Sequence, residues 1–367
     1  MHEAGNSGSK PSVIILGAGV SGLSAALALL RHGHAVTLLE RGEVGAESSW
    51  AGGGILSPLL PWDYPAALSA LALRSMAGYA GWVADVEAHS GRSAEYWRCG
   101  MQVLGEAQPD SALAWCTAHG LTAQRRSAPA GGSLWLPDIA QVRNPRLVAA
   151  LREAVGRLGG IIHVHSAVES VATEAGHLVA VHTAQDTYRA DRFVLATGAW
   201  SGIALPGLAG VPNIRPIRGQ MLLFKLPPDV LDSILYRNGL YLIPRRDGHV
   251  LVGSTLEDAG FDKATDAATR QRLHRDAAEL LPALASAAPV LHWAGLRPGS
   301  PDNLPIIDRH PDFDNVFVNA GHYRYGVTLA PASAELLVDL MEGNTPALDP
   351  TPYRWQAALE RRWSDTL

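Results

Sequence analysis

The sequence predicts a mixed α/β fold, in which a nucleotide-binding domain built from discontinuous segments holds an inserted, mainly antiparallel β domain. Three observations predict it: a strand–helix–strand unit with a glycine run over residues 13–40, a middle region rich in short strands and turns, and a strand followed by a helix over residues 315–341. The 367 residues exceed the usual domain length of about 100–200 residues, so the chain is long enough for both parts.

Composition and charge exclude several classes of protein. Hydrophobic residues make up 47% of the chain and charged residues 18%, which is enough to bury a large core. The net charge of −5 gives no basic surface for nucleic acid, and the first apolar stretch is far shorter than the roughly 20 residues that span a bilayer. Two cysteines, Cys99 and Cys116, are too few for a disulfide framework. We therefore expect a soluble, cytoplasmic protein with no nucleic-acid or membrane partner.

The first strand–helix–strand unit predicts a dinucleotide site. Apolar strands are expected at residues 13–16 and 34–40, and a glycine run at residues 17–22 leads into a helix over residues 23–31. A pyrophosphate binds to backbone N–H groups at a helix N-terminus, and glycines let it approach because they carry no side chain. Glu40 ends the second strand and can accept hydrogen bonds from both ribose hydroxyls. This order of elements predicts a Rossmann-like domain.

Two further segments with glycines indicate which dinucleotide is bound. Residues 48–55 form a second glycine-rich run soon after Glu40, as expected where a wide, flat ring system lies against backbone. Residues 193–200 form a β-branched and aromatic run that contains Ala-Thr-Gly, where small residues again allow close approach. Together with the first glycine run, these segments favour FAD.

The remaining elements follow from hydrophobic spacing and turn residues. Helical spacing predicts helices over residues 66–89, 145–158, 264–281 and 326–341. Strands are expected over residues 161–168, 169–173, 178–183, 240–244, 249–255 and 315–319. The Asp-Gly step at residues 247–248 predicts a hairpin between two of these strands.

This order of elements predicts how the chain divides into domains. We expect the FAD-binding domain to comprise residues 11–90, 143–213 and 295–345. We expect the substrate-binding domain to comprise residues 91–142 and 214–294, and tails at residues 1–10 and 346–367.

Several motifs carry a resemblance to a known family. Beside the glycine runs at 13–40 and 48–55, they lie at residues 215–220, 252–262, 295–298, 321–324 and 326–331. On these motifs, and over about residues 12–345, the sequence resembles the D-amino acid oxidase superfamily of flavoproteins and, within it, the glycine oxidases of the thiamine pathway.

The resemblance implies an FAD that is bound without a covalent link, since neither cysteine accompanies the C-terminal motifs. Val20 and Ser21 would meet the pyrophosphate, Glu40 and Arg41 the adenosine ribose, and Val168 the adenine. With the glycine-run and strand-end residues, the expected cofactor contacts are Gly17, Gly19, Val20, Ser21, Gly22, Glu40, Arg41, Ser48, Ser49, Gly53, Gly54, Ile55, Val168, Thr197, Gly198, His322, Tyr323, Arg324, Tyr325, Gly326, Val327 and Thr328. The helix near Gly326 would aim N–H groups at the ring, where reduction accumulates negative charge.

For the substrate, the resemblance implies that Arg297 binds an α-carboxylate, with Tyr241 and Arg324 near it. A guanidinium suits this role because its planar fork makes two parallel charge-assisted hydrogen bonds. The sequence departs from the family at Tyr325, where Asn is common, and at Leu256, where some relatives carry Met. Larger side chains beside the ring would narrow or reroute access to the pocket.

The resemblance implies oxidative deamination of glycine and similar small amines, such as sarcosine and small D-amino acids. A hydride would pass from the substrate Cα to flavin N5, and imine hydrolysis would give the oxo acid and ammonia, while O2 would become hydrogen peroxide. No catalytic side chain is expected, and no metal, because His163 and His165 have no third ligand at a suitable spacing. The imine would serve the thiazole of thiamine, with hand-off to thiazole synthase, and a homo-oligomer is compatible with this reading.

Other readings remain open at this point. A D-amino acid or sarcosine oxidase would keep the flavin and Arg297 but differ in pocket width. A dehydrogenase would reduce another acceptor than O2, and a flavin-binding module without activity would bind the cofactor alone.

Overall fold

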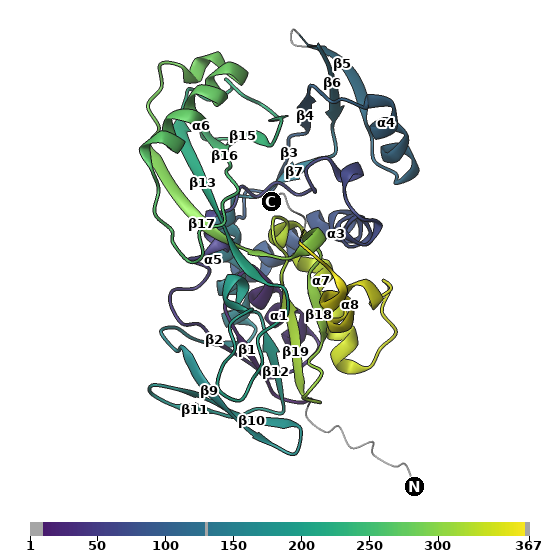
Figure 1. Ribbon diagram of the computed structural model, residues 1–367, viewed down its shortest axis with the longest axis vertical. Helices are drawn as coiled ribbons and strands as arrows, with labels where there is room; N and C mark the ends of the chain where they lie inside the picture. The colour runs from purple at the N-terminus through teal and green to yellow at the C-terminus, as the bar shows by residue number, and fades with distance from the viewer. Residues whose placement is uncertain (1–9, 129–130, 364–367) are drawn as a thin grey trace.

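The computed structural model describes residues 10–128 and 131–363. Figure 1 shows one half built around a parallel sheet, and another half built around a larger, mainly antiparallel sheet. The mixed α/β fold class predicted from the sequence is confirmed.

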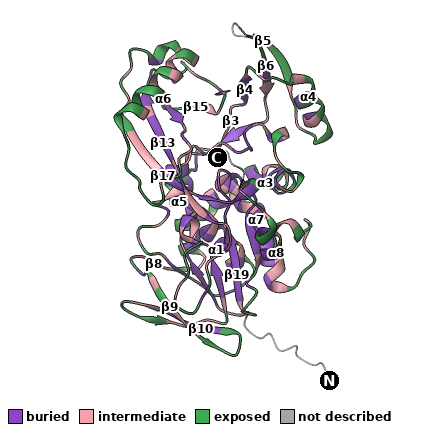
Figure 2. Ribbon diagram, in the orientation of Figure 1, coloured by how far each residue is buried: buried purple, intermediate pink, exposed green. Residues whose placement is uncertain are grey.

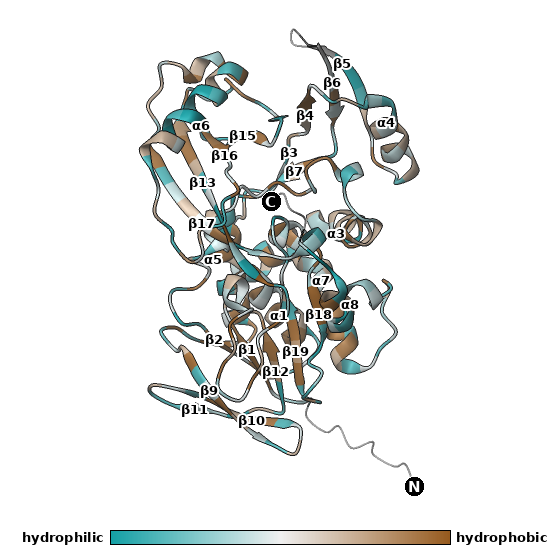
Figure 3. Cartoon of the chain, viewed as in Figure 1, coloured by the Kyte–Doolittle hydropathy of each residue, from teal (hydrophilic) through white to brown (hydrophobic). Residues whose placement is uncertain are grey.

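The parallel sheet has six strands. In spatial order they are β18 (Ile306–Arg309), β19 (Val316–Ala320), β12 (Arg192–Leu195), β1 (Val13–Leu16), β2 (Val36–Leu39) and β8 (Ile161–His163). Only β18 runs antiparallel to its neighbour. The central strands are buried on both faces, which explains their continuous runs of apolar residues (Figure 3).

Helices cover one face of this sheet. They are α1 (Val20–Arg31), α5 (Asn144–Arg157) and α7 (Gly326–Glu342), and α3 (Ala66–Ser90) packs on α5 and α7. The alanine- and leucine-rich α1 is almost wholly buried, because it packs against both α5 and α7. Leu23 and Leu27 of α1 lie in the same core as Leu151 of α5 and Leu337 of α7. Figure 2 shows the parallel sheet and the helices packed on it as largely buried. This packing fixes the N-terminus of α1 at the carboxyl ends of the parallel strands.

The opposite face of the parallel sheet carries a small antiparallel sheet and a short helix. The sheet consists of β9 (Val168–Glu174), β10 (His177–Thr183) and β11 (Thr187–Tyr188), and the helix is α8 (Trp355–Glu360). Trp355 packs with Phe193 of β12 in a second core. The region from residue 346 onward, predicted as a tail, therefore contributes to the packing.

One strand prediction was too long. The sequence pattern predicted a strand over residues 161–168, but β8 ends at His163. His165 has a φ of 53°, which turns the chain out of extended geometry. His163 and His165 therefore do not share one strand face, and the His165 ring contacts Glu43 at 3.0 Å.

The larger sheet has eight strands. In spatial order they are β17 (Leu291–Gly299), β13 (Arg215–Lys225), β16 (His249–Gly253), β15 (Leu240–Pro244), β14 (Ile234–Arg237), β4 (Met101–Leu104), β6 (Gly131–Leu136) and β5 (Gln124–Ala128). All neighbours are antiparallel except β14 and β4. The predicted hairpin joins β15 to β16, with Gly248 at a φ of 83°.

Two helices and three short elements complete the second half. They are α6 (Ala267–Leu280), α4 (Pro109–Ala118), β3 (Trp97–Arg98), β7 (Ala140–Gln141) and α2 (Ser48–Ala51). Strand β17 runs through residues 294 and 295 and pairs along its length with β13. The predicted domain boundary falls inside this strand, and the division into two domains stays a prediction.

Among the described residues, no helix is long and apolar enough to cross a membrane.

Candidate active site

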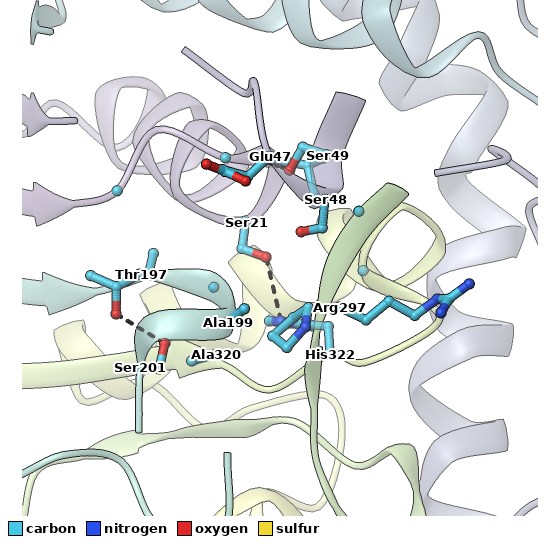
Figure 4. A pocket seen from close by; sticks show the side chains of 18 of the residues that line it. Ser21, Glu47, Ser48, Ser49, Thr197, Ala199, Ser201, Arg297, Ala320 and His322 are labelled. Carbon is cyan, nitrogen blue, oxygen red and sulfur yellow. Dashed lines mark hydrogen bonds between the residues drawn. The ribbon is translucent and has the colours of Figure 1, made fainter. Parts of the chain in front are cut away.

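The carboxyl ends of the central parallel strands open into one long cavity of about 370 Å³. It begins beside β1, β2 and β12, passes residues 48–55, and continues to the eight-stranded sheet. Side chains from distant parts of the sequence, among them Ser21, Ser48, Thr197 and His322, line it together (Figure 4). Every site residue expected from the sequence lines this cavity except Gly22.

Glycines shape the turn between β1 and α1. Gly17 has a φ of 103°, and a Cβ there would overlap the carbonyl oxygen of Ala196. A Cβ on Gly22 would overlap the carbonyl oxygen of Gly17. Gly22 therefore lets α1 pack closely against the turn, and it lies behind the cavity wall.

Glu40 joins the ends of the first two parallel strands. Its Oε2 accepts a hydrogen bond of 2.9 Å from the Ala18 N–H, and its Oε1 accepts one of 3.0 Å from the Gly42 N–H. Each carboxylate oxygen keeps acceptor capacity for a further donor. Beside it, the guanidinium of Arg41 lies 3.4 Å from the ring centroid of Trp200. Val168, at the start of β9, lines the same end of the cavity.

The second glycine-rich run lies across the N-terminus of α1. The Val20 N–H donates a hydrogen bond of 2.9 Å to Oγ of Ser49, in the short helix α2. Gly54 has a φ of 80°, and a Cβ there would overlap the Val142 carbonyl oxygen. Only glycine fits at this position, as the close approach inferred from the sequence requires.

Arg245, which follows β15, holds this run in place. The Arg245 side chain is buried and donates a hydrogen bond of 2.8 Å to the carbonyl oxygen of Gly53 and one of 3.0 Å to that of Val142. The sequence analysis missed this residue, because it treated Arg245 only as part of a hairpin turn. No sequence signal separates a buried arginine from its exposed neighbour Arg246.

The segment after β12 forms a third wall of the cavity. Gly198 has a φ of 58° and begins the 3-10 turn Gly198–Trp200. The hydroxyls of Thr197 and Ser201 lie 3.0 Å apart, which fixes the Thr197 side chain at the strand end (Figure 4).

His322 connects two helices beneath the cavity. Its Nδ1 lies 3.4 Å from Oγ of Ser21 in α1, and its Nε2 lies 3.1 Å from Oγ of Ser333 in α7 (Figure 4). The side chain is buried, and burial lowers the pKa of His322 to about 4. The ring is therefore neutral at pH 7 and acts as a hydrogen-bonding spacer between α1 and α7.

This lowered pKa predicts how acid affects stability. Between about pH 4 and about pH 6.5, the unfolded chain binds one more proton at His322 than the folded protein, so the free energy of unfolding falls as the pH falls, by up to about 1.4 kcal/mol per pH unit. When the pH is lowered from about 6.5 to about 5, we expect the free energy of unfolding of wild type to fall by about 2 kcal/mol more than that of His322→Gln. Denaturant titrations at the two pH values measure this difference. Equal losses in the two proteins would contradict a neutral, buried His322.

Tyr325 closes one side of the cavity. Its hydroxyl donates to that of Tyr64, and the two rings meet edge to face with centroids 5.3 Å apart. Burial raises the pKa of Tyr325 well above its usual range, so the phenol stays protonated. The large side chain expected from the sequence therefore forms a fixed wall, packed against the segment before α3 (Ala66–Ser90).

Two arginines and a tyrosine meet at the end of the cavity that faces the eight-stranded sheet. Arg297 of β17 and Tyr241 of β15 lie next to each other, and Arg324 lines the same cavity. No ion pair joins either guanidinium to a carboxylate within the described ranges. Arg297 is partly buried, and desolvation lowers its pKa, which reflects the free-energy cost of removing a cation from water without a nearby anion.

Arg297 lies in a space that a glycine leaves free. A Cβ on Gly219 of β13 would lie 2.5 Å from the Arg297 Cζ. The neighbouring residue, Arg218, accepts a weak hydrogen bond from Arg297 Nη1 through its carbonyl oxygen at 3.4 Å. The cation thus lies flat against backbone, with its edge toward the cavity.

Comparison with known proteins identifies the family. A family model described as FAD dependent oxidoreductase matches residues 12–340. The chain belongs to this family. The FAD-dependent oxidoreductases are flavoproteins, so the cofactor predicted from the sequence is confirmed.

Relatives of this FAD-dependent oxidoreductase cover nearly its whole length. Glycine oxidase from Pseudomonas aeruginosa is 42% identical over 354 residues, which cover 93% of this chain and 97% of the relative. The bifunctional protein ThiO/ThiG from Nostoc is 32% identical, covering 90% of this chain but only 52% of the relative. The crystal structure of glycine oxidase from Geobacillus kaustophilus matches with a TM-score of 0.88 and 27% identity, covering 94% of this chain and 98% of that chain.

The residues present fit FAD. Gly53 lines the cavity and lies close against the eight-stranded sheet, where a Cβ would lie 2.7 Å from Ile243 Cδ1, so glycine lets this run pack on the sheet. Asn319, at the end of β19, gives independent evidence: it is 1% exposed, lines the cavity, and neither polar atom of its amide has a partner among the described residues. Buried amides of this kind are normally hydrogen-bonded, so a ligand or water is expected there.

The sequence analysis missed Asn319. The sequence pattern predicts only that this residue ends a strand over residues 315–319, yet it is the sole polar residue in the otherwise apolar β19 (Val316–Ala320). A single amide at the carboxyl end of a buried parallel strand is a signal that could have marked it.

Proposed function

We propose that this FAD-dependent oxidoreductase oxidises the amine of glycine and of similar small amino acids. The observation that carries the proposal is Arg297, a partly buried cation without a carboxylate partner among the described residues, in the same cavity as the dinucleotide-binding glycines. The full-length similarity to glycine oxidases supports glycine as the substrate. The overall reaction takes glycine, dioxygen and water to glyoxylate, ammonia and hydrogen peroxide.

The chain contributes binding and orientation to this reaction. When bound, FAD would supply the acceptor for the hydride from the substrate Cα and the route of the electrons to dioxygen. Arg297 binds the substrate carboxylate through two parallel charge-assisted hydrogen bonds. Tyr241 and Arg324 complete the polar end of the pocket, and holding Cα in one orientation supplies most of the rate acceleration. No side chain is needed as a general base, provided the amine binds in its neutral form.

The aromatic residues around Arg297 support a small substrate. Tyr241, Tyr323 and Tyr325 all line the cavity and are at most 8% exposed. Tyr325 is fixed by its contacts with Tyr64, so it does not swing aside for a bulky substrate side chain. This arrangement favours glycine and sarcosine over large D-amino acids.

The cofactor contacts expected from the sequence are part of the proposal. The N-terminus of α1, from Gly19 to Ser21, would hold the pyrophosphate, and Glu40 with Arg41 would hold the adenosine ribose. The start of α7 at Gly326 would stabilise negative charge on the ring. We add Asn319 to this set, because its unpartnered amide faces the same cavity.

A place in thiamine synthesis is the second part of the proposal. The similarity to one half of the bifunctional ThiO/ThiG protein supports a link to thiazole synthesis. In such a link, the imine of glycine would be handed to a thiazole synthase before hydrolysis, and dioxygen would be the electron acceptor.

Peroxide formation with a panel of small amines tests the proposed function. We expect activity with glycine and sarcosine, weaker activity with D-alanine, and little with bulky D-amino acids. Turnover of bulky D-amino acids alone would contradict the proposed substrate. Reduction of dyes without peroxide would indicate a dehydrogenase, and failure of every amine to bleach the flavin would indicate a binding protein.

A further inference from the structure

Two sequence motifs contain residues that the proposed reaction leaves without a role. One is residues 215–220, which lie in β13, and the other is residues 252–262, which begin in β16 and continue into the segment before α6. These segments are joined by a cluster of polar side chains directly behind Arg297. Gln220 is the centre of this cluster, with 0% of its surface exposed.

The Gln220 amide contacts two carboxylates and a histidine. Its Nε2 donates to Glu257 Oε1 at 3.1 Å and to Asp266 Oδ2 at 2.9 Å. Its Oε1 accepts from His292 Nε2 at 3.0 Å and from the Asp266 N–H at 3.2 Å. All the hydrogen-bonding capacity of the amide is used within the protein, so Gln220 is not itself a ligand contact.

The Glu257 carboxylate also attaches the second motif, residues 252–262, to β13. Glu257 Oε2 accepts from Arg218 Nε at 2.8 Å and Nη2 at 2.6 Å, and the backbones of these two residues exchange two further hydrogen bonds. Thr255 Oγ1 accepts from the Gln220 N–H at 2.8 Å and donates to Glu257 Oε1. The segment around Thr255 is thus held on β13 by side chains as well as by backbone.

Arg297 rests on this segment. Its Nη1 donates to the Thr255 carbonyl oxygen at 3.1 Å, and its Nη2 donates to Ser254 Oγ at 2.6 Å. The position of the guanidinium therefore depends on where the cluster places Ser254 and Thr255. A shift of either acceptor would rotate the edge of the guanidinium that donates hydrogen bonds to a carboxylate.

We propose that Gln220 is a positioning residue for Arg297, and that its neutral amide keeps the Glu257 and Asp266 carboxylates together so that Ser254 and Thr255 hold the guanidinium in its substrate-binding orientation. The inference deepens the proposed function and rests on Arg297 as the carboxylate-binding residue. The proposed role of Gln220 also explains both motifs, residues 215–220 and 252–262, because both help to hold Arg297 in position.

Charge explains why a neutral amide is needed. The two carboxylates face Gln220 from one side, Arg218 pairs with Glu257, and His292 lies opposite with Arg270 near it. Hydrogen bonding to Gln220 is the main cause that lowers the pKa of Asp266 to about 2. A third carboxylate in this cluster would repel the other two, and its own pKa would be raised.

The test is Gln220→Glu, measured on the FAD-loaded enzyme at about pH 5.5 and about pH 8. When protonated, the introduced carboxyl group keeps one donor and one acceptor, whereas its ionised form loses the donor and adds charge. Acetate, a small carboxylate, serves as the probe, and its Kd is read from the perturbed flavin absorption spectrum. The matched control is Gln271→Glu, which adds the same charge at an exposed position of α6.

We expect the acetate Kd and the KM for glycine of Gln220→Glu to rise about tenfold relative to wild type at about pH 8, with kcat changed by less than about twofold. At about pH 5.5 the acetate Kd of Gln220→Glu should lie within about twofold of the wild-type value. Gln271→Glu should match wild type at both pH values. The inference would be overturned if Gln220→Glu bound acetate with wild-type affinity at both pH values, or if its affinity for acetate fell equally at both.

Arg297→Met, measured in parallel, separates this inference from the proposed function. If Arg297→Met binds acetate as wild type does, the assignment of Arg297 fails and the inference fails with it. If Arg297→Met loses acetate binding and Gln220→Glu does not, only the positioning role of Gln220 is overturned.

Discussion

Replacement of Arg297 by methionine is expected to raise the KM for glycine at least about 100-fold while FAD stays bound. Removing one partner of a desolvated charge pair costs about 2–5 kcal/mol, because the substrate carboxylate then loses the cation that pairs with it. Methionine is chosen because it fills much of the space of the arginine stem without its charge. Arg324 would remain in the cavity, so some affinity for carboxylates is expected to persist.

The measurement is steady-state peroxide formation with glycine, together with the flavin content and absorption spectrum of the purified protein. Arg272→Met, at an exposed position of α6, is the control for loss of one arginine. A KM within about twofold of the wild-type value would remove Arg297 from the substrate site. Loss of flavin would instead show that the substitution disturbs more than the carboxylate pocket.

The nucleotide-binding unit could be predicted from the sequence because its signals are local. A strand, a glycine turn, a helix and a second strand follow one another within residues 13–40, and each carries its own spacing. In the structure, hydrogen bonds from the Ala18 and Gly42 N–H groups hold Glu40 beside the turn. Ala18 and Glu40 are only 22 residues apart in the sequence. Such short separations leave little room for another arrangement.

Arg245, which the sequence did not indicate as a site residue, depends on contacts between distant segments. Arg245 reaches Gly53 across 192 residues, and its burial follows from the packing of the β15–β16 hairpin against the second glycine run. Arg297 could be identified only through the motif around it, since its acceptors Ser254 and Thr255 lie more than 40 residues earlier. Spacing along the chain contains no information on such pairs.

The strand predicted over residues 161–168 shows a different limit. Alternating apolar residues continue past the end of β8, but pairing with β2 ends at His163, where β2 itself ends at Leu39. A strand extends only as far as its neighbour provides backbone partners, and a hydrophobic pattern does not record the length of that neighbour.

Replacement of Gly19 by leucine is expected to give a folded protein that lacks FAD. Gly19 precedes α1 with a φ of −75° and a ψ of −178°, which any residue can adopt, so the backbone tolerates the substitution. A Cβ there would lie 3.1 Å from Ser49 Oγ, and the rest of the side chain would enter the cavity at the N-terminus of α1. This is the space that the pyrophosphate needs.

We expect the FAD Kd of Gly19→Leu to rise at least about 100-fold, which corresponds to about 2.7 kcal/mol, and the purified protein to be colourless. Flavin content by absorbance and FAD titration by fluorescence measure this directly. Gly156→Leu, at an exposed position in α5 with no atom within 4 Å of the new Cβ, is the matched control and should retain its flavin.

Far-ultraviolet circular dichroism separates loss of cofactor from loss of fold. The buried residues of α1, such as Leu23 and Leu27, lie in the core and do not line the cavity, so the core packing of α1 should persist. The thermal midpoint should nevertheless fall, because bound FAD stabilises only the folded state. A Gly19→Leu protein that purifies with a full complement of flavin would show that the pyrophosphate does not lie at the N-terminus of α1.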